Sequence, residues 1–271
     1  MGYKWLGKTW YKMDFNCDLI IIAGGDGTVR KVIMKLLQRK VFVKPLPVAI
    51  LPLGTANNIT HSLGINHDPA EIINSLHNYK IKKYDLGRVY NVPEGKFFLE
   101  GFGFGILPYL MQIMHKQEKK EQADEELKTA LDNLHHCLMS YQSKDCRIKA
   151  DGKDYSGKYF MVEIMNANFI GPRLLLSPSG DPGDGRIEVV LLPESQRDLF
   201  ANYIFNKMQG METSYSFEKL KAKQISISWN GKSAHLDDEI IKMKKNKKIK
   251  IKINEAMIEF LLPQAENENS K

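Results

Sequence analysis

Asp-Leu-Ile-Ile-Ile-Ala-Gly-Gly-Asp-Gly-Thr, residues 18–28, is the stretch that decides the fold. Its apolar run, Leu19 to Ala23, predicts a buried parallel strand, and the glycines after it predict a tight turn. Apolar residues then recur at helical spacing, at Val29, Val32, Ile33, Leu36 and Leu37. A strand, a glycine turn and a helix start are the parts of a phosphate site, because backbone N–H groups approach an anion closely there.

This loop follows neither the Walker pattern nor Gly-x-Gly-x-x-Gly, so neither of those nucleotide sites is predicted. Asp26 is unusual in it, because a carboxylate beside phosphates repels them. Binding of a hydrated Mg²⁺ or of a substrate hydroxyl would explain its presence.

Residues 47–58, Pro-Val-Ala-Ile-Leu-Pro-Leu-Gly-Thr-Ala-Asn-Asn, repeat the arrangement. A short apolar strand, Val48 to Leu51, ends in a loop of Gly, Thr and Asn, and a helix is expected after it. Two strand ends with polar loops suit a ligand crevice at the carboxyl edge of a parallel sheet. A purely structural turn would also use Gly and Asn.

Gly-Gly-Asp-Gly-Thr followed by Pro-Leu-Gly-Thr-Ala-Asn-Asn resembles the catalytic domain of the diacylglycerol kinase family, which includes sphingosine kinases and bacterial lipid kinases. NAD kinases and phosphofructokinases are similar at the first motif only. The resemblance implies ATP and Mg²⁺ as cofactors and a lipid as substrate. It implies a nucleotide site that contains Gly24, Gly25, Asp26, Gly27, Thr28, Val29, Arg30, Gly54, Thr55 and Asn57.

Three carboxylates stand together downstream, at Asp237, Asp238 and Glu239. They resemble the family's Asp-Gly-Glu motif, with Asp238 in place of glycine. By that match Glu239 is the proton acceptor, and Asp237 positions it or the metal; Asp26 is the third candidate catalytic residue. On a strand, 237 and 239 would face the same side. An acidic surface turn is the structural alternative.

Ser177 to Arg186 forms an oxygen-rich loop of the kind that suits Mg²⁺ or Ca²⁺. It resembles the family's metal loop, which implies ligands from the Asp184 carboxylate and the backbone oxygens of Asp181 and Arg186. Spacing alone favours a simple Asp-Gly turn. Asp85 also matches a family position, and we expect it to brace the site between the domains.

Composition narrows the class of protein. The 271 residues are 43% hydrophobic and 26% charged, with a net charge of +7 and a pI near 9.1. Nucleic acid, an anionic membrane or a phosphorylated ligand would fit this charge, as would a solvated basic surface. No nucleic-acid signature accompanies it, so none is expected as a partner. Three scattered cysteines and the lack of a signal or membrane-spanning segment predict a cytoplasmic protein. The net positive charge adds the expectation of peripheral contact with anionic membrane.

The pattern of strands and helices predicts a small α/β nucleotide-binding domain with a parallel sheet, followed by a larger antiparallel β-sandwich. The first comprises residues 1–84 and a returning segment at about 257–271, and the second residues 85–256. We expect helices over 68–79, within 106–141 and over 194–209, and a hairpin of 86–92 with 96–102. Further strands are expected at 147–150, 158–166, 186–192, 224–229 and 248–253. Phe102, Phe104, Leu107 and Leu110 either line a lipid slot or pack in the core.

The N-terminal residues depart from the family. Its members begin with another strand and helix, whose Asn-Pro loop touches the nucleotide, and residues 1–17 contain no such loop. Either the N-terminus is shortened or these residues replace the unit differently. A sheet edge left exposed could be covered by a second copy, giving a homodimer. Two alternative functions follow: a nucleotide- or lipid-binding protein without catalysis, and a kinase of a soluble nucleotide such as NAD.

Overall fold

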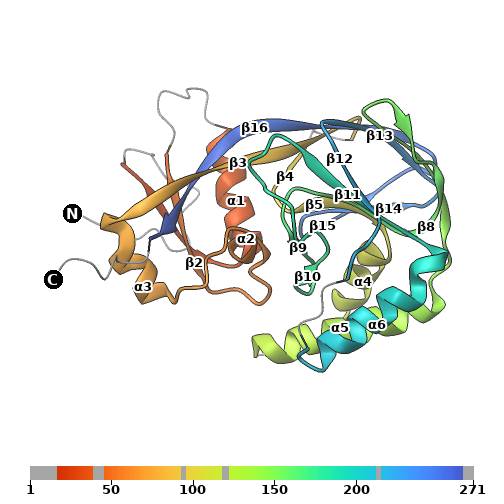
Figure 1. The fold of residues 1–271 in the computed structure, drawn as a ribbon, viewed down its shortest axis with the longest axis horizontal. Coiled ribbons are helices and arrows are strands. Elements are labelled where there is room, and N and C mark those ends of the chain that lie inside the picture. Colours follow the sequence, from red (N-terminus) through yellow and green to blue (C-terminus); the bar gives the residue numbers. More distant parts are fainter. Residues whose placement is uncertain (1–16, 39–45, 93–95, 118–121, 212–214, 265–271) are drawn as a thin grey trace.

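The structure, a computed structural model, describes residues 17–38, 46–92, 96–117, 122–211 and 215–264. These form a small α/β unit and a larger antiparallel β-sandwich with helices packed on it (Figure 1). The predicted fold class is confirmed. The predictions for residues 1–16, for the hairpin turn at 93–95 and for the tail after residue 264 lie outside the described residues. Among the described residues, no helix has the length and apolar character needed to cross a bilayer.

The α/β unit is built on the two quoted stretches. Strands β1 (Ile20–Gly24) and β2 (Val48–Pro52) pair in parallel, with Ile22 opposite Ile50. Each strand is followed by a loop and a helix, and the helices are α1 (Asp26–Leu37) and α2 (Asn58–Ser62). The inward-facing side chains of β1, β2 and α1 form one apolar core with those of α2 and with Ile258 and Phe260. The strand, turn and helix therefore form as the apolar run and the helical spacing after it predict.

The helix predicted over 68–79 is shorter in the structure. It is α3 (Pro69–Asn74), followed by a 3-10 turn, η2 (Ser75–His77). Its start is as expected, because Asp68 accepts a hydrogen bond from the Glu71 N–H and Glu71 accepts one from the Asp68 N–H. Its end comes early because the chain tightens into η2 and enters the next strand at Tyr79.

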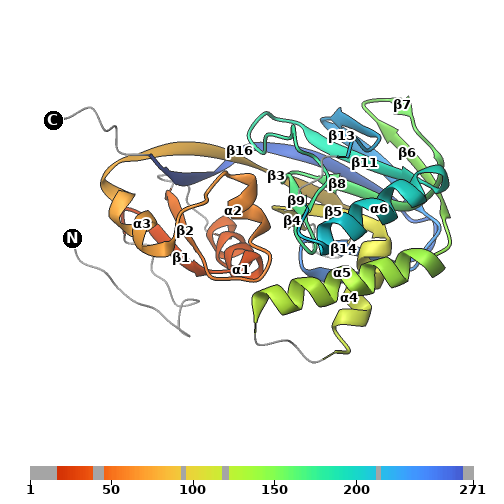
Figure 2. The ribbon, with the colours of Figure 1, turned by 60° about the horizontal axis from the view of Figure 1, so that its bottom comes forward.

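Two long strands run from the α/β unit into the sandwich (Figures 1 and 2). They are β3 (Tyr79–Tyr90) and β16 (Lys248–Pro263), which pair antiparallel along almost their whole length. The strand predicted at 248–253 thus continues into the first part of the predicted returning segment as one strand, interrupted by a bulge between Asn254 and Ile258. β16 also pairs with β2 in the α/β unit and with β13 in the sandwich.

The sandwich contains the remaining strands. Its main path runs β16-β13-β6-β8-β5-β14-β15, with β11 beside β8. The strands are β4 (Phe97–Phe98), β5 (Gly101–Gly105), β6 (Lys144–Ala150), β7 (Lys153–Asp154), β8 (Gly157–Met165), β9 (Phe169–Ile170), β10 (Leu174–Leu175), β11 (Ile187–Pro193), β12 (Lys219–Ala222), β13 (Gln224–Trp229), β14 (Ser233–Leu236) and β15 (Glu239–Lys242).

Three helices pack on this sandwich (Figure 2). The helical region predicted at 106–141 is divided into α4 (Ile106–Met114) and α5 (Ala123–Ser140), and the helix predicted at 194–209 is η3 (Glu194–Gln196) followed by α6 (Arg197–Met208). Phe102, Phe104, Leu107 and Leu110 are all at most 3% exposed, in the core of the sandwich or beneath these helices. The lipid-slot interpretation of those four side chains is therefore wrong, and core packing accounts for them.

Candidate active site

The two predicted loops lie in contact, because their strands are neighbours. Gly24 is opposite Pro52 in the parallel ladder, and the loops leave the sheet at the same edge. A Cβ atom added to Gly54 would lie 2.3 Å from Gly25 Cα, and one added to Gly25 would lie 2.8 Å from Gly54 Cα. Only glycine at both positions allows this backbone contact. The sequence-predicted loops therefore form one surface.

Asp26 joins the two motifs. It is the first residue of α1, and its carboxylate oxygens accept hydrogen bonds from the N–H groups of Asn58 and Ile59, both at 2.9 Å. The carboxylate therefore caps α2, whose N-cap residue, Asn57, has a left-handed backbone and no side-chain cap bond. Burial raises the pKa of Asp26, while those two N–H groups lower it. This position explains the acidic residue in the loop without a metal or a substrate hydroxyl.

Side chains of the second loop hold its shape. The Asn57 amide donates to the Gly54 carbonyl at 2.8 Å and accepts from the Gly54 N–H at 2.9 Å. Arg173, on the segment between β9 and β10, donates to the carbonyl oxygens of Thr55 and Ala56 at 2.9 and 3.1 Å. The loop is therefore held from within and from the sandwich side.

The N-terminus of α1 faces this surface with its backbone groups. Its N-cap, Gly25, provides no side-chain cap; the Thr28 N–H already donates to the Gly25 carbonyl at 2.9 Å, so only the N–H groups ahead of it can meet an anion. Thr28 is exposed beside them. Val29 departs from its predicted role: its side chain is 1% exposed, in the core, and its N–H donates to the Gly25 carbonyl at 3.1 Å. It supports the turn and does not face a ligand.

The three downstream carboxylates lie on a hairpin turn. Leu236, at the end of β14, pairs with Glu239, at the start of β15, and Asp237 and Asp238 form the turn between them. Asp237 adopts a φ of 50°, so it is this residue, not Asp238, that takes the backbone conformation favoured by glycine. The expectation that 237 and 239 share one face of a strand is wrong, because the chain reverses between them.

The hairpin turn nevertheless lies against the first glycine loop, at the start of α1. A Cβ atom added to Gly27 would lie 2.7 Å from Asp238 Oδ2. The first turn of α1 and the hairpin turn therefore approach each other closely, although more than two hundred residues separate them. The segments that the motifs singled out form a single candidate site between the α/β unit and the sandwich.

Arg30 links the two sides of this site. Its Nε donates to Asp237 Oδ2 at 3.0 Å and its Nη1 donates to Glu239 Oε1 at 2.7 Å. The Arg30 side chain is only 8% exposed, so its charge is balanced by the two carboxylates and is little solvated. The resemblance places Arg30 in the nucleotide site, but its guanidinium is bound to the acidic turn.

Asp237 is fully enclosed. Besides Arg30, the N–H groups of Leu99, Glu100 and Gly101 donate to its carboxylate at 2.9–3.2 Å. Burial raises the pKa of Asp237 to about 6, against the lowering effect of Arg30 and of those N–H groups. Its side chain is only 1% exposed, so it positions other groups.

Glu239 is the accessible carboxylate of the pair. Its side chain is 43% exposed, and its oxygens accept hydrogen bonds from Arg30 at 2.7 Å and from Lys96 Nζ at 2.8 Å. Partial burial raises the pKa of Glu239, but hydrogen bonds from Lys96 and Arg30 outweigh it and hold that pKa below the ordinary range. Glu239 is therefore an ionised oxygen acceptor at the rim of the site.

A second buried acid lies behind the loops. Glu100 accepts a hydrogen bond at 2.8 Å from the side chain of Asn58, the residue whose backbone N–H binds Asp26. Burial, followed by the charges of Asp26 and Asp237, raises the pKa of Glu100 well above its ordinary value. Burial thus favours the protonated form of this carboxyl group.

A buried pair supports the hairpin turn from below. The His235 side chain, 2% exposed, contacts Glu163 Oε2 through Nε2 at 2.8 Å and the Asp237 carbonyl oxygen through Nδ1 at 3.1 Å. Burial lowers the pKa of His235, but the Glu163 carboxylate outweighs it and the net direction is upward. Gly103 leaves the space for Glu163, since a Cβ there would lie 2.0 Å from its carboxylate.

The predicted metal loop lies beside the long strands. The Asp85 carboxylate accepts from the N–H groups of Gly185 and Ala256, both at 2.7 Å, and so joins this loop to the bulge of β16. Asp181 and Asp184 each bind a lysine, and the N–H of Arg186 donates to Asp184 Oδ1 at 2.9 Å. The described residues include no cluster of three or more His, Cys, Asp or Glu side chains arranged to hold a metal.

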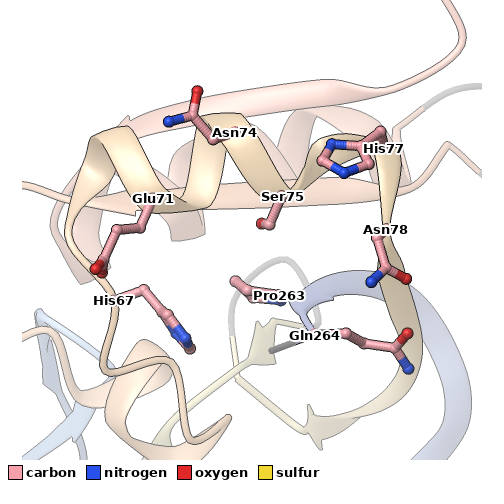
Figure 3. A pocket seen from close by; sticks show the side chains of 8 residues that line it. All are labelled: His67, Glu71, Asn74, Ser75, His77, Asn78, Pro263 and Gln264. Atoms are coloured by element: carbon pink, nitrogen blue, oxygen red, sulfur yellow. The ribbon is translucent and has the colours of Figure 1, made fainter. Parts of the chain in front are cut away.

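A separate pocket lies away from these loops. It has a volume of about 320 Å³, between α3 and η2 on one side and the end of β16 on the other, and Figure 3 shows Ser75 pointing into it. Its lining includes His67 and Glu71 but none of the residues predicted from the motifs. The pocket and the candidate active site are therefore different features.

Sequence reasoning missed the supporting roles of Lys96, Arg173 and Glu100, the last of which binds Asn58 of the second motif. None lies in a recognisable pattern. Their partners are 42 to 143 residues away along the chain, and only the tertiary fold brings them together.

Known proteins resemble this chain along most of its length. Residues 8–89 match the diacylglycerol kinase catalytic domain, and residues 115–255 match the YegS C-terminal NAD kinase beta sandwich-like domain. A Staphylococcus aureus (strain MSSA476) protein named "Putative lipid kinase" is 25% identical over 219 residues, covering 79% of this chain and 67% of that protein.

Solved structures have the same fold. The crystal structure of a diacylglycerol kinase from Bacillus anthracis str. Sterne has a TM-score of 0.65 at 20% identity and covers 92% of this chain and 78% of its own. A second structure from that organism has a TM-score of 0.69 at 22% identity and covers 96% and 84%. At these identities the likeness establishes the fold alone.

Proposed function

Because the chain belongs to the diacylglycerol kinase-like family of lipid kinases, we propose that it transfers the γ-phosphoryl group of Mg-ATP to a lipid hydroxyl. The observation that carries the proposal is the contact between Gly27 and Asp238, which sets an accessible carboxylate, Glu239, beside the open N-terminus of α1. Phosphoryl transfer needs an anion cradle and a proton acceptor next to each other.

The phosphates of ATP bind at the two glycine loops. Their charge is opposed by the N-terminus of α1, since Arg30 is already paired with Asp237 and Glu239. Mg²⁺ bound to the nucleotide would supply neutralisation of the charge on the phosphoryl oxygens. Gly24, Gly25, Gly27, Gly54 and Asn57 form this surface, with Thr28 and Thr55 beside it.

Glu239 accepts the proton. The lipid oxygen forms a bond to the γ-phosphorus, the bond from that phosphorus to the bridging oxygen of ADP breaks, and the hydroxyl proton passes to Glu239. The low pKa of Glu239 keeps it ionised at neutral pH, as a late proton acceptor in a loose transition state requires. Asp237 acts through Arg30, which holds Glu239 in place.

The acceptor is a lipid alcohol, with diacylglycerol, a sphingoid base and phosphatidylglycerol as candidate classes. Such a molecule is presented at a bilayer or micelle surface, and the net charge of +7 favours an anionic one.

A transfer assay tests the proposal. The protein is incubated with γ-labelled ATP, Mg²⁺ and a mixed lipid extract in micelles, and the label in the organic phase is measured. We expect labelled lipid with the wild type and none with Glu239→Gln, because the amide cannot accept the proton. Glu125→Gln, the same change on the exposed side of α5, is the control and should retain transfer.

Two results would contradict this function. Equal turnover in Glu239→Gln would exclude the role of that carboxylate. A folded wild-type protein that labels no lipid would favour a binding protein without catalysis.

A further inference from the structure

The Ser177–Arg186 loop is the one family feature that the chemistry of phosphoryl transfer does not use. Its resemblance to a metal loop implies that a divalent cation is held by Asp184 and by backbone oxygens of Asp181 and Arg186. The side chains that surround the loop decide whether such an ion fits.

Both acidic side chains of the loop are already bound to ammonium groups. Asp184 Oδ2 accepts a hydrogen bond from Lys221 Nζ at 2.8 Å, and Asp181 Oδ1 accepts one from Lys82 Nζ at 2.5 Å. The other Asp184 oxygen accepts from the Arg186 N–H at 2.9 Å. Hard cations bind through several oxygen ligands at once, and these oxygens are engaged by donors.

Lys221 lies between two carboxylates, those of Asp184 and Glu188. On β12 it is directly opposite Glu188 of β11, and its Nζ is 3.2 Å from Glu188 Oε1. The Glu188 side chain is only 6% exposed, so its charge requires a close cation. One ammonium group thus bridges the loop carboxylate and a buried carboxylate, as a bound divalent ion would.

Two backbone carbonyl oxygens of the loop are also used. The Asp181 carbonyl accepts from the Asp184 N–H at 3.2 Å, and the neighbouring Pro182 carbonyl accepts from the Asp85 N–H at 2.6 Å. The loop is closed by these bonds and by the Asp85 carboxylate, which accepts from the Gly185 N–H. The residues present therefore do not fit a divalent cation.

We propose that Lys82 and Lys221 replace a divalent cation in the Ser177–Arg186 loop, so that the loop is held by ammonium groups and its folding needs no metal. The proposal concerns the structure of the loop and is independent of the kinase reaction. Any divalent ion that the reaction requires then arrives with the nucleotide.

The first test uses the wild-type protein without nucleotide. We expect the same melting temperature in EDTA, in millimolar Mg²⁺ and in millimolar Ca²⁺, and no stoichiometric heat of binding when either ion is titrated by calorimetry. A lower melting temperature in EDTA would overturn the proposal. So would one-to-one binding that Asp184→Asn abolishes.

The second test removes the ammonium group. In Lys221→Gln, Asp184 and Glu188 lose their shared cation, so we expect the melting temperature in EDTA to fall by about 2–4 °C. Ca²⁺ should then restore part of the loss, because the two carboxylates become free to bind it. Lys219→Gln is the matched control: Lys219 lies on the same strand but donates to the Ser179 hydroxyl, at 2.8 Å.

The two lysine variants separate the outcomes. An equal fall in Lys221→Gln and Lys219→Gln, with no response to Ca²⁺ in either, would refute a cation-replacing role. If Lys221→Gln does not fold, Lys221→Arg keeps the positive charge. It should then fold and remain insensitive to EDTA, and sensitivity to EDTA in that variant would count against the proposal.

Discussion

Replacing Arg30 by Met tests the assembly of the site most directly. The change removes the cation that binds Asp237 at 3.0 Å and Glu239 at 2.7 Å, and leaves an aliphatic side chain of similar length. Removing one partner of a buried ion pair costs about 3–5 kcal/mol. Asp237 keeps its three backbone donors and Glu239 keeps Lys96, so we expect the lower end, about 3 kcal/mol of unfolding free energy.

The loss should depend on pH in a defined direction. The pKa of Asp237 is raised from 3.8 to about 6 in the folded protein, so folding takes up a proton there and stability falls as pH rises through that range. Without Arg30 this pKa rises further. The destabilisation should therefore be largest near pH 8 and shrink toward pH 5, by at most about 1.4 kcal/mol for each pH unit.

Urea unfolding of both proteins between pH 5 and pH 8 measures this difference. Lys31→Met is the control, because Lys31 is the next residue of α1 but is exposed, and its loss should stay within about 0.5 kcal/mol. An Arg30→Met loss of the same size at pH 5 and pH 8 would refute the reasoning, since it would mean that Asp237 does not depend on Arg30.

Two further predictions concern buried groups of the site. Burial raises the pKa of Glu100 well above its ordinary value, so folding binds a proton there and stability falls as pH rises. The Glu100→Gln variant mimics the protonated form, so it should melt at a higher temperature than the wild type near pH 8 and at the same temperature near pH 5. A lower melting temperature for this variant at both pH values would contradict the raised pKa of Glu100. Gly54→Ala should cost about 1–3 kcal/mol in urea unfolding, because the new Cβ meets the Gly25 backbone at 2.3 Å. Gly27→Ala should be tolerated, because its Cβ meets only the end of the Asp238 side chain, which is 47% exposed and can move; equal losses in the two variants would argue against the glycine contact.

The parts of the fold that the sequence predicts are those with local causes. The apolar run before Gly24 forms β1 because one of its faces is buried and the other half-buried, and the Asp68–Glu71 capping box starts α3 because both bonds are formed within four residues. No bounds were predicted for strands β14 and β15. They are four residues each, and the turn between them carries Asp at the position with a φ of 50°, where glycine would have been the clearer signal.

The sequence predicts which segments belong to the candidate site, but not which hydrogen bonds join them. The motifs located both glycine loops and the acidic turn, because each is continuous in sequence. The partner of Arg30 could not be predicted, since position 30 is in the first motif and Asp237 is 207 residues away. The role of Asp26 was missed for the same reason: its hydrogen bonds run to Asn58 and Ile59, across the sheet edge.

The ribbon of β3 and β16 has a consequence for dissecting the protein. A cut between Tyr84 and Asp85 passes through the middle of β3 and would separate residues 79–84 from their ladder partners, residues 258–263 of β16. Each half would then expose unpaired backbone groups along a former interior strand. Neither half is an autonomous folding unit: the two collapse or persist together, and an isolated nucleotide-binding fragment has to carry the end of the chain with it.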